Sequence, residues 1–193
     1  MKKRTVGLLI TALIIGTLIV MTVKSNMETA EPIDTIVVGA DTTTIEYESG
    51  LEEGNTPPDF ELSTLSDDII KLTDYKGKKV ILNFWASWCG PCKAEMPHIQ
   101  NYYEKNKDSA NVEIIAVNLT TAERSGLEGI EKFVDAYGLT FPIPLDNDGE
   151  VMNAYNILPI PTTYMIGTDG KIKHKIIGPM DEKTIKELVD NLD

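Results

Sequence analysis

Only two residues separate the two cysteines of this chain, Cys89 and Cys92, in the segment NFWASWCGPCKAEMP at residues 83–97. A pair with this spacing can supply two ligands of a zinc site, close a small structural disulfide, or form a disulfide that opens and closes during a reaction. Each use predicts different partners elsewhere in the chain, so the rest of the sequence discriminates between them.

The zinc and structural alternatives find little support. A structural zinc site takes four ligands, commonly as two close pairs, but the two histidines, His98 and His174, lie far apart in the sequence and form no second pair. A disulfide across so short a loop stabilises a fold by roughly 2 kcal/mol, against ~4.7 kcal/mol for a loop of about a hundred residues. A chain that buries a full hydrophobic core gains little from such a bond.

A reactive pair needs one thiol that ionises easily, because the thiolate is the form that attacks a disulfide. Cys89 follows a predicted buried strand and opens a predicted helix, where unpaired amides and the positive end of the helix dipole stabilise a thiolate. Pro91 suits the first turn of that helix, and Cys92, one turn in, is the more shielded resolving thiol. We therefore interpret the pair as a redox-active disulfide.

The elements around the pair follow from hydrophobic patterning. KVILNFWA at residues 79–86 is a nearly continuous apolar run, typical of a strand buried on both faces. Residues 92–106 have helical spacing, with Met96, Ile99 and Tyr103 on one face. The other predicted elements are a hairpin turning at 66–68, a strand at 111–119, a helix at 126–139 stopped by Gly138, an extended segment at 141–146, a short helix at 148–157, a hairpin at 162–177 turning at 169–170, and a helix at 181–192 with Asp181 as its N-cap. This order predicts one mixed sheet with helices on both faces.

Composition limits the class of protein. The chain has 193 residues, of which 42% are hydrophobic and 25% charged, which indicates a single globular domain. Its net charge of −12 argues against nucleic acid as a partner, because such binding needs basic patches.

The first residues predict a membrane anchor. Residues 1–4 (MKKR) are a basic cytoplasmic region, and residues 5–23 contain no charge and give a helix of about 28 Å, close to the thickness of a bilayer core. A cleaved signal peptide is the alternative, but its apolar region is usually shorter. With the basic end inside, the remainder lies outside the cell membrane, where disulfides persist. Residues 24–54 are interpreted as an extracytoplasmic tether, with a short strand around 43–47.

Two separated motifs resemble the thioredoxin superfamily. FWASWCGPCK at residues 84–93 is close to the thioredoxin signature, and Pro97 lies where thioredoxins kink the following helix. ILPIPTTYMIG at 157–167 is similar to the family's cis-proline segment, which puts Pro161 opposite the cysteines, and Gly178 matches a glycine that lines the same groove.

The resemblance covers residues 55–193 and implies a thioredoxin-like α/β fold. The expected architecture is a central mixed β-sheet flanked by helices, with an N-terminal β-hairpin and a central insertion at 126–145, preceded by one transmembrane helix. The resemblance also implies that an extended substrate pairs with backbone groups in a groove. Its expected residues are Trp88, Gly90, Pro91, Ile160, Pro161 and Gly178. The exchange needs neither a cofactor nor a metal ion.

Asn83 and Glu95 depart together from cytosolic thioredoxin. That family carries a buried aspartate where this chain has Asn83, which cannot accept a proton from a thiol. Glu95 lies three residues after Cys92, on the same helix face, and a buried carboxylate there can take and return the Cys92 proton. The alternative is an ordinary surface glutamate. We expect Glu95 to be the third catalytic residue, with the two cysteines.

Together with the anchor and the central insertion, these features resemble the membrane-anchored ResA/TlpA-like thiol–disulfide oxidoreductases, which have an AhpC/TSA-like domain. Such proteins reduce protein disulfides on the outer face of bacterial membranes, for example in apocytochrome c or in spore-envelope maturation. They receive electrons from a CcdA/DsbD-like membrane protein. ResA itself carries a glutamate where this chain has Gly90. The Gly-Pro pair between the cysteines is the thioredoxin choice, associated with a potential near about −270 mV, and predicts a reductant.

Two other functions remain as alternatives. A thiol peroxidase needs a threonine three residues before its reactive cysteine, a position held here by Ala86. A non-catalytic adaptor tends to lose a cysteine, and this chain keeps both. Of the flanking residues, Trp85 is interpreted as core and Trp88 as part of the substrate face, whereas Lys93, His98 and His174 are interpreted as surface or structural residues.

Overall fold

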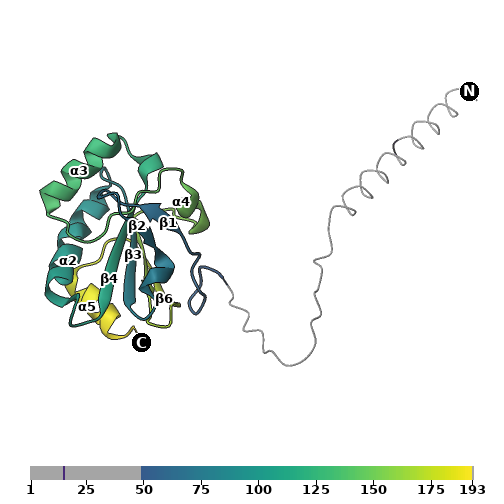
Figure 1. Ribbon diagram of the computed structural model, residues 1–193, viewed down its shortest axis with the longest axis vertical. Coiled ribbons are helices and arrows are strands. Elements are labelled where there is room, and N and C mark those ends of the chain that lie inside the picture. The colour runs from purple at the N-terminus through teal and green to yellow at the C-terminus, as the bar shows by residue number, and fades with distance from the viewer. Residues whose placement is uncertain (1–14, 16–48, 193) are drawn as a thin grey trace, which may run out of the picture. The chain divides into compact units, whose positions relative to one another are not determined.

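The computed structural model describes Ile15 and residues 49–192, and Figure 1 shows helices packed around a central sheet. In chain order the elements are β1 (Glu61–Ser63), β2 (Ile69–Lys71), the 3₁₀ helix η1 (Leu72–Tyr75), β3 (Lys79–Trp85), α2 (Gly90–Asn106), β4 (Val112–Asn118), the 3₁₀ helix η2 (Thr120–Ala122), α3 (Gly126–Tyr137), α4 (Glu150–Ala154), β5 (Thr162–Ile166), β6 (Ile172–Ile177) and α5 (Glu182–Asp190). Every predicted element that falls on described residues is present.

The main sheet has four strands in the order β4-β3-β5-β6. β3 pairs in parallel with β4 and antiparallel with β5, and β5 pairs antiparallel with β6. The predicted mixed sheet is therefore confirmed. β1 and β2 form the predicted N-terminal hairpin, as a separate two-stranded sheet.

Alternate side chains of β3 enter two different hydrophobic cores, because successive residues of a strand face opposite sides of the sheet. Ile81 and Trp85 pack with α2, α3 and α5 on one side. Leu82 and Phe84 pack with the hairpin, η1 and α4 on the other. Asn83 lies between Ile81 and Trp85 in this alternation, so the strand directs a polar side chain towards α2.

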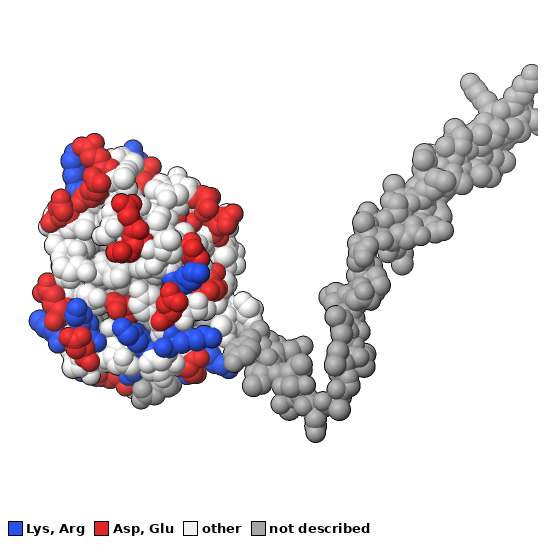
Figure 2. All heavy atoms as spheres, in the orientation of Figure 1, with Lys and Arg blue, Asp and Glu red and all other residues white. Residues whose placement is uncertain are grey.

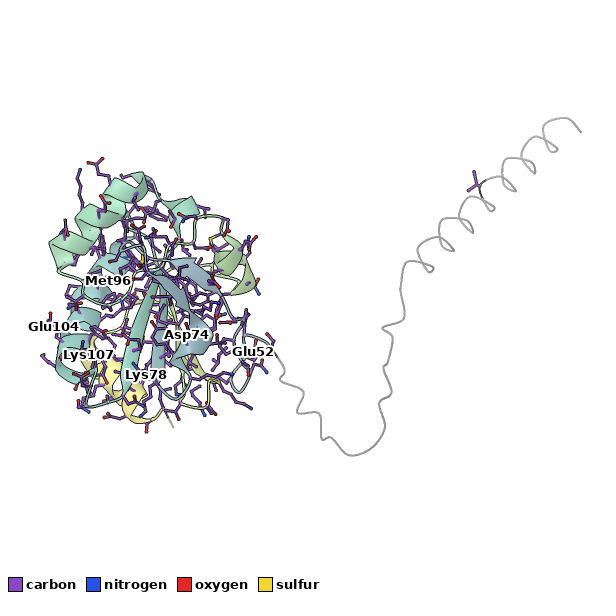
Figure 3. The ribbon with its side chains drawn as sticks, viewed as in Figure 1. Glu52, Asp74, Lys78, Met96, Glu104 and Lys107 are labelled. Carbon is purple, nitrogen blue, oxygen red and sulfur yellow. A yellow bond between two sulfur atoms is a disulfide. The ribbon has the colours of Figure 1, made fainter. Side chains whose placement is uncertain are left out.

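The helix α2 buries the face that the sequence predicts. Met96, Ile99 and Tyr103 are all buried, and Pro97 lies inside the helix with its own side chain exposed. Figure 3 follows α2 from Met96 past Glu104 to Lys107, the end far from the cysteines. Because α2 packs against the sheet along this face, its N-terminal turn has a fixed position at the end of β3.

Loop and cap residues also follow the sequence. Gly138 ends α3 with φ of 60°, in the left-handed region that favours glycine. Asp181 caps α5, its side chain accepting a hydrogen bond from the Thr184 amide at 2.8 Å. Figure 2 shows acidic side chains spread over the visible face of the described domain, with most of the basic ones in its lower half and a few at its upper edge.

The predicted anchor, tether and strand at 43–47 lie outside the described residues, apart from Ile15 and residues 49–54. Among the residues that the structure describes, no helix is long and apolar enough to cross a membrane. Residues 49–54 run beside the sheet, where Gly54 donates from its amide to Ile172 O at 2.7 Å.

Candidate active site

Cys89 and Cys92 lie at the junction between β3 and α2 and are joined by a disulfide. Cys89 is the N-cap of α2, and its sulfur accepts a hydrogen bond from the Cys92 amide at 3.2 Å. The exposed fraction is 3% for Cys89 and 0% for Cys92. The prediction that Cys89 opens the helix, with an unpaired amide facing its sulfur, is therefore confirmed, and Cys92 is the more shielded of the two.

The two residues between the cysteines lie at the surface. Gly90 and Pro91 form the first turn of α2, and both are exposed. The missing N–H of Pro91 costs nothing there, since the first amides of a helix have no intrahelical acceptor. Cys89 N donates to Ala86 O at 3.1 Å, which turns the chain from the strand into the helix.

A second segment faces the cysteines from the start of β5. The Ile160–Pro161 peptide bond is cis, as the sequence motif predicts, and Ile160 O lies 3.9 Å from the Cys89 sulfur. Gly178, after β6, has φ of 103° and donates from its amide to Pro161 O at 2.9 Å. The predicted groove residues on this side, far apart in the sequence, thus lie next to one another. Their role in binding substrate stays a prediction.

Glu95 is completely buried, with an exposed fraction of 0%, so the surface interpretation of this residue is wrong. Its Oε1 accepts a hydrogen bond from Asn83 Nδ2 at 2.8 Å, and its Oε2 accepts one from the Met180 amide at 3.3 Å. Burial raises the pKa of Glu95 to about 7, while the two hydrogen bonds lower it and only partly offset the burial. A carboxylate with this pKa can exchange a proton near neutral pH.

Asn83 is the residue that holds Glu95, a role that sequence reasoning missed. Its amide Nδ2 also donates to Thr163 Oγ1 at 2.9 Å, across the β3–β5 pair, and both side chains are buried. Asn83 Oδ1 has no hydrogen-bond partner among the described residues. The Asn83 side chain therefore donates two hydrogen bonds through Nδ2, while its Oδ1 accepts none from the described residues. The sequence shows that Asn83 replaces the aspartate of thioredoxin, but it does not show the contact of Asn83 with Glu95.

Of the two tryptophans that flank the site, Trp85 lies in the core as predicted, whereas the role of Trp88 in the substrate face stays a prediction. Trp85 is fully buried, stacks on Phe133 with ring centroids 4.6 Å apart, and donates from its indole to Ala116 O at 3.0 Å. Trp88 is 36% exposed and lies directly before Cys89. Lys93 and His98 are exposed on α2.

The sequence is similar to those of known thiol–disulfide oxidoreductases. A model of the AhpC/TSA family matches residues 54–175. The chain belongs to the AhpC/TSA family. It is 43% identical over 139 residues to "Thiol-disulfide oxidoreductase ResA" of Geobacillus thermodenitrificans, covering 72% of this chain and 77% of that protein. It is also 43% identical over 144 residues to "Thioredoxin-like protein YneN" of Bacillus subtilis, covering 74% of this chain and 82% of that one.

Solved structures agree with the fold. The crystal structure of StoA from Bacillus subtilis matches with a TM-score of 0.61 and 40% identity, over 68% of this chain and 96% of that one. The family, the thioredoxin-like fold and the Cys89–Cys92 disulfide together identify the chain as a thiol–disulfide oxidoreductase that works by dithiol–disulfide exchange.

Proposed function

We propose that this family member is a reductant of protein disulfides outside the cell membrane. The exchange chemistry of this proposal is supported by the buried Glu95, hydrogen-bonded to Asn83 and Met180 on the helix face that holds Cys92. Its direction rests on the Gly90-Pro91 pair between the cysteines. A resolving thiol must lose its proton before it can attack, and here a carboxylate with a pKa of about 7 lies one helical turn away.

In the first step the Cys89 thiolate of the reduced enzyme attacks one sulfur of the substrate disulfide. The substrate S–S bond breaks, a bond forms between Cys89 and that sulfur, and the other substrate sulfur leaves as a thiolate. The Cys92 amide, which points at the Cys89 sulfur, stabilises the negative charge before the attack.

In the second step Cys92 gives its proton to Glu95 and attacks the Cys89 sulfur. The mixed disulfide breaks, the second substrate sulfur leaves as a thiolate, and the Cys89–Cys92 disulfide forms. The substrate has then gained two electrons and the enzyme has lost two. In the reverse direction, when a donor reduces the enzyme, Glu95 returns the proton to the leaving Cys92 sulfur.

The direction is tested by the reduction potential of the full chain, measured against glutathione or dithiothreitol buffers. The Gly90-Pro91 pair predicts a reduction potential of about −270 mV, which is typical of reductants. We expect the reduced protein to reduce insulin and Cys89→Ala to lose that activity entirely. A potential above about −180 mV would assign the chain to the oxidants, and insulin reduction by the Cys89→Ala variant would exclude the dithiol mechanism.

The proposed location rests on the sequence of residues 1–23, a basic tetrad followed by an uncharged apolar run. We infer a single-pass anchor with its N-terminus in the cytoplasm and its catalytic domain outside. The substrates are then disulfide-bonded proteins such as apocytochrome c or spore-envelope proteins, and a CcdA/DsbD-type membrane protein supplies electrons.

Location and partner can be tested together. In intact cells from which the wall has been removed, we expect added protease to degrade the domain. A Cys92→Ala variant retains the mixed disulfide on Cys89, and mass spectrometry of that adduct identifies the partner. Protection of the domain from external protease would contradict the proposed orientation.

A further inference from the structure

The segment that follows β4 forms hydrogen bonds with the residues immediately before Cys89. Glu123 accepts hydrogen bonds on Oε1 from the Ser87 amide at 2.6 Å and on Oε2 from the Ser87 hydroxyl at 2.5 Å. A third donor, Asn118 Nδ2, lies 2.8 Å from Oε1. Asn118 is fully buried at the end of β4, so these bonds link the sheet to the active-site loop through one carboxylate.

The neighbours of Glu123 hold the next residue of the loop. The Trp88 indole donates to Ala122 O at 2.8 Å, and the Arg124 guanidinium lies 4.2 Å from the centre of the Trp88 ring, in a cation–π contact. Three successive residues, 122–124, therefore contact two successive residues, 87–88.

The loop needs an external acceptor. Its backbone makes one turn, from Cys89 N to Ala86 O, but the acceptor for the Ser87 amide among the described residues is the Glu123 side chain and not a carbonyl. A backbone N–H without a partner in a partly buried loop costs free energy. Without Glu123, the loop would turn that amide towards water and move Trp88 with it.

We propose that Glu123 is a positioning residue for thiol–disulfide exchange. It forms no hydrogen bond with either cysteine and acts through Ser87 and Trp88, which it fixes at the rim of the site. Ser87 and Trp88 also line an open hollow between α2 and α3, together with Lys93, Phe133 and Tyr137. A protein substrate that presents its disulfide to Cys89 lies against this rim, whereas a small disulfide reaches the sulfur without it. The inference rests on the exchange chemistry and not on its direction or on the location of the protein.

The experiment compares Glu123→Ala with Glu123→Gln in the full chain. Glutamine can keep all three contacts, because its oxygen accepts from the Ser87 and Asn118 amides while its NH₂ donates to the serine hydroxyl. For Glu123→Ala we expect kcat/KM for insulin reduction to fall about tenfold, since a loosened rim must be reordered at each encounter. The rate with 5,5′-dithiobis(2-nitrobenzoate) should change less than twofold, and Glu123→Gln should restore most of the insulin rate.

A second readout reports on the loop directly. In NMR spectra, the indole N–H of Trp88 should exchange faster in Glu123→Ala, whereas that of Trp85, bonded to Ala116 O in the core, should not change. Ser87→Ala removes one of the three contacts and should show both effects at smaller size. Glu131→Ala, which removes an exposed carboxylate on α3, is the control and should match the wild type.

The outcomes separate a positioning role from the alternatives. Equal losses for insulin and the small disulfide, with faster exchange at Trp85, would show a general structural defect and overturn the proposal. A Glu123→Gln variant as slow as Glu123→Ala would also overturn it, because charge and not geometry would then be decisive. A wild-type protein that reduces neither insulin nor the small disulfide would instead contradict the assigned exchange chemistry. The wild-type insulin assay therefore separates failure of that chemistry from failure of this proposal.

Discussion

The two sulfurs of the active site belong to one helical turn, yet different kinds of group surround them. The Cys89 sulfur faces backbone atoms, the Cys92 amide at 3.2 Å and Ile160 O at 3.9 Å. Cys92 shares its helix face with Glu95, a side chain whose protonation changes near neutral pH. In the proposed mechanism, backbone groups of the fold stabilise the attacking sulfur, whereas a titratable side chain serves the resolving sulfur.

This difference teaches how substitutions can separate the two half-reactions. The amide that faces Cys89 is a backbone group of Cys92, which α2 presents by forming a helix, so substitutions other than proline keep it. In the proposed second step, the proton acceptor is Glu95. It is hydrogen-bonded to Asn83, which is hydrogen-bonded in turn to Thr163, and all three side chains are buried. Variants of these side chains should change the second half-reaction and leave the first intact.

The largest effect is expected for Glu95→Gln. Glutamine keeps the shape of the side chain but cannot accept the Cys92 proton, so resolution of the mixed disulfide should slow by about 10²–10⁴-fold, the usual contribution of a positioned general base. Formation of the mixed disulfide should be unaffected. Acid quenching followed by mass spectrometry measures both steps, because the covalent adduct accumulates when only the second is slow.

Glu104→Gln serves as the control for that variant, because Glu104 is an exposed carboxylate further along α2, as Figure 3 shows. It should resolve the adduct at the wild-type rate. Equal slowing of both steps in Glu95→Gln would remove the distinction between the two sulfurs.

A second prediction concerns stability and pH, measured on the oxidised protein so that neither cysteine titrates. The folded pKa of Glu95, about 7, lies above its ordinary value of 4.5, so the folded state binds more protons between these values. Its contribution is fully present below about pH 4.5 and is lost as pH rises through about 7, at a cost of roughly 3 kcal/mol. Glu95→Gln cannot ionise and should escape this loss.

Urea unfolding of both proteins at pH 5 and pH 8.5 tests the sign. Other groups with shifted pKa values, such as Asp146 and Asp181, are common to both proteins and cancel in the difference. We expect the variant to gain about 2.5 kcal/mol over the wild type between the two pH values, because a small part of the loss has already occurred at pH 5. A constant difference would mean that Glu95 does not titrate in this range.

The sequence predicts the parts of this site that depend on local patterning. The apolar run before Cys89 and the position of Pro91 predict a junction between a strand and a helix. The helical period then places Glu95 on the same face as Cys92. The thioredoxin resemblance adds Pro161, which no local pattern connects with the cysteines.

The parts that sequence reasoning misses depend on tertiary contact. The sequence predicts Glu95 as a buried carboxylate but not the groups that hold it. Those groups are Asn83 on β3 and the Met180 amide in the turn before α5. Glu123 lies 36 residues from Ser87 in the sequence and meets it because β3 and β4 are neighbours. Hydrogen bonds of this kind have no period and no spacing, so a single sequence carries no signal for them.

The smallest effect is expected from the partners of Glu95. Asn83→Leu replaces the amide by an apolar group of similar size, which removes the Nδ2 donor without opening a cavity for water. Because that hydrogen bond lowers the pKa of Glu95, its loss should raise the pKa by about one unit, the scale of one hydrogen bond to a charged group. Thr163→Val removes only the second acceptor of the Asn83 amide and should shift the pKa by less than about half a unit.

Carbon-13 NMR of the Glu95 carboxyl in the oxidised protein measures both shifts directly as a function of pH. The order Asn83→Leu above Thr163→Val above wild type is expected, because the first variant removes the contact with the carboxylate and the second only loosens it. A pKa that stays at about 7 in Asn83→Leu would show that burial alone sets the protonation of Glu95. The resolving sulfur would then, like Cys89, be controlled by the fold and not by a dedicated side-chain partner.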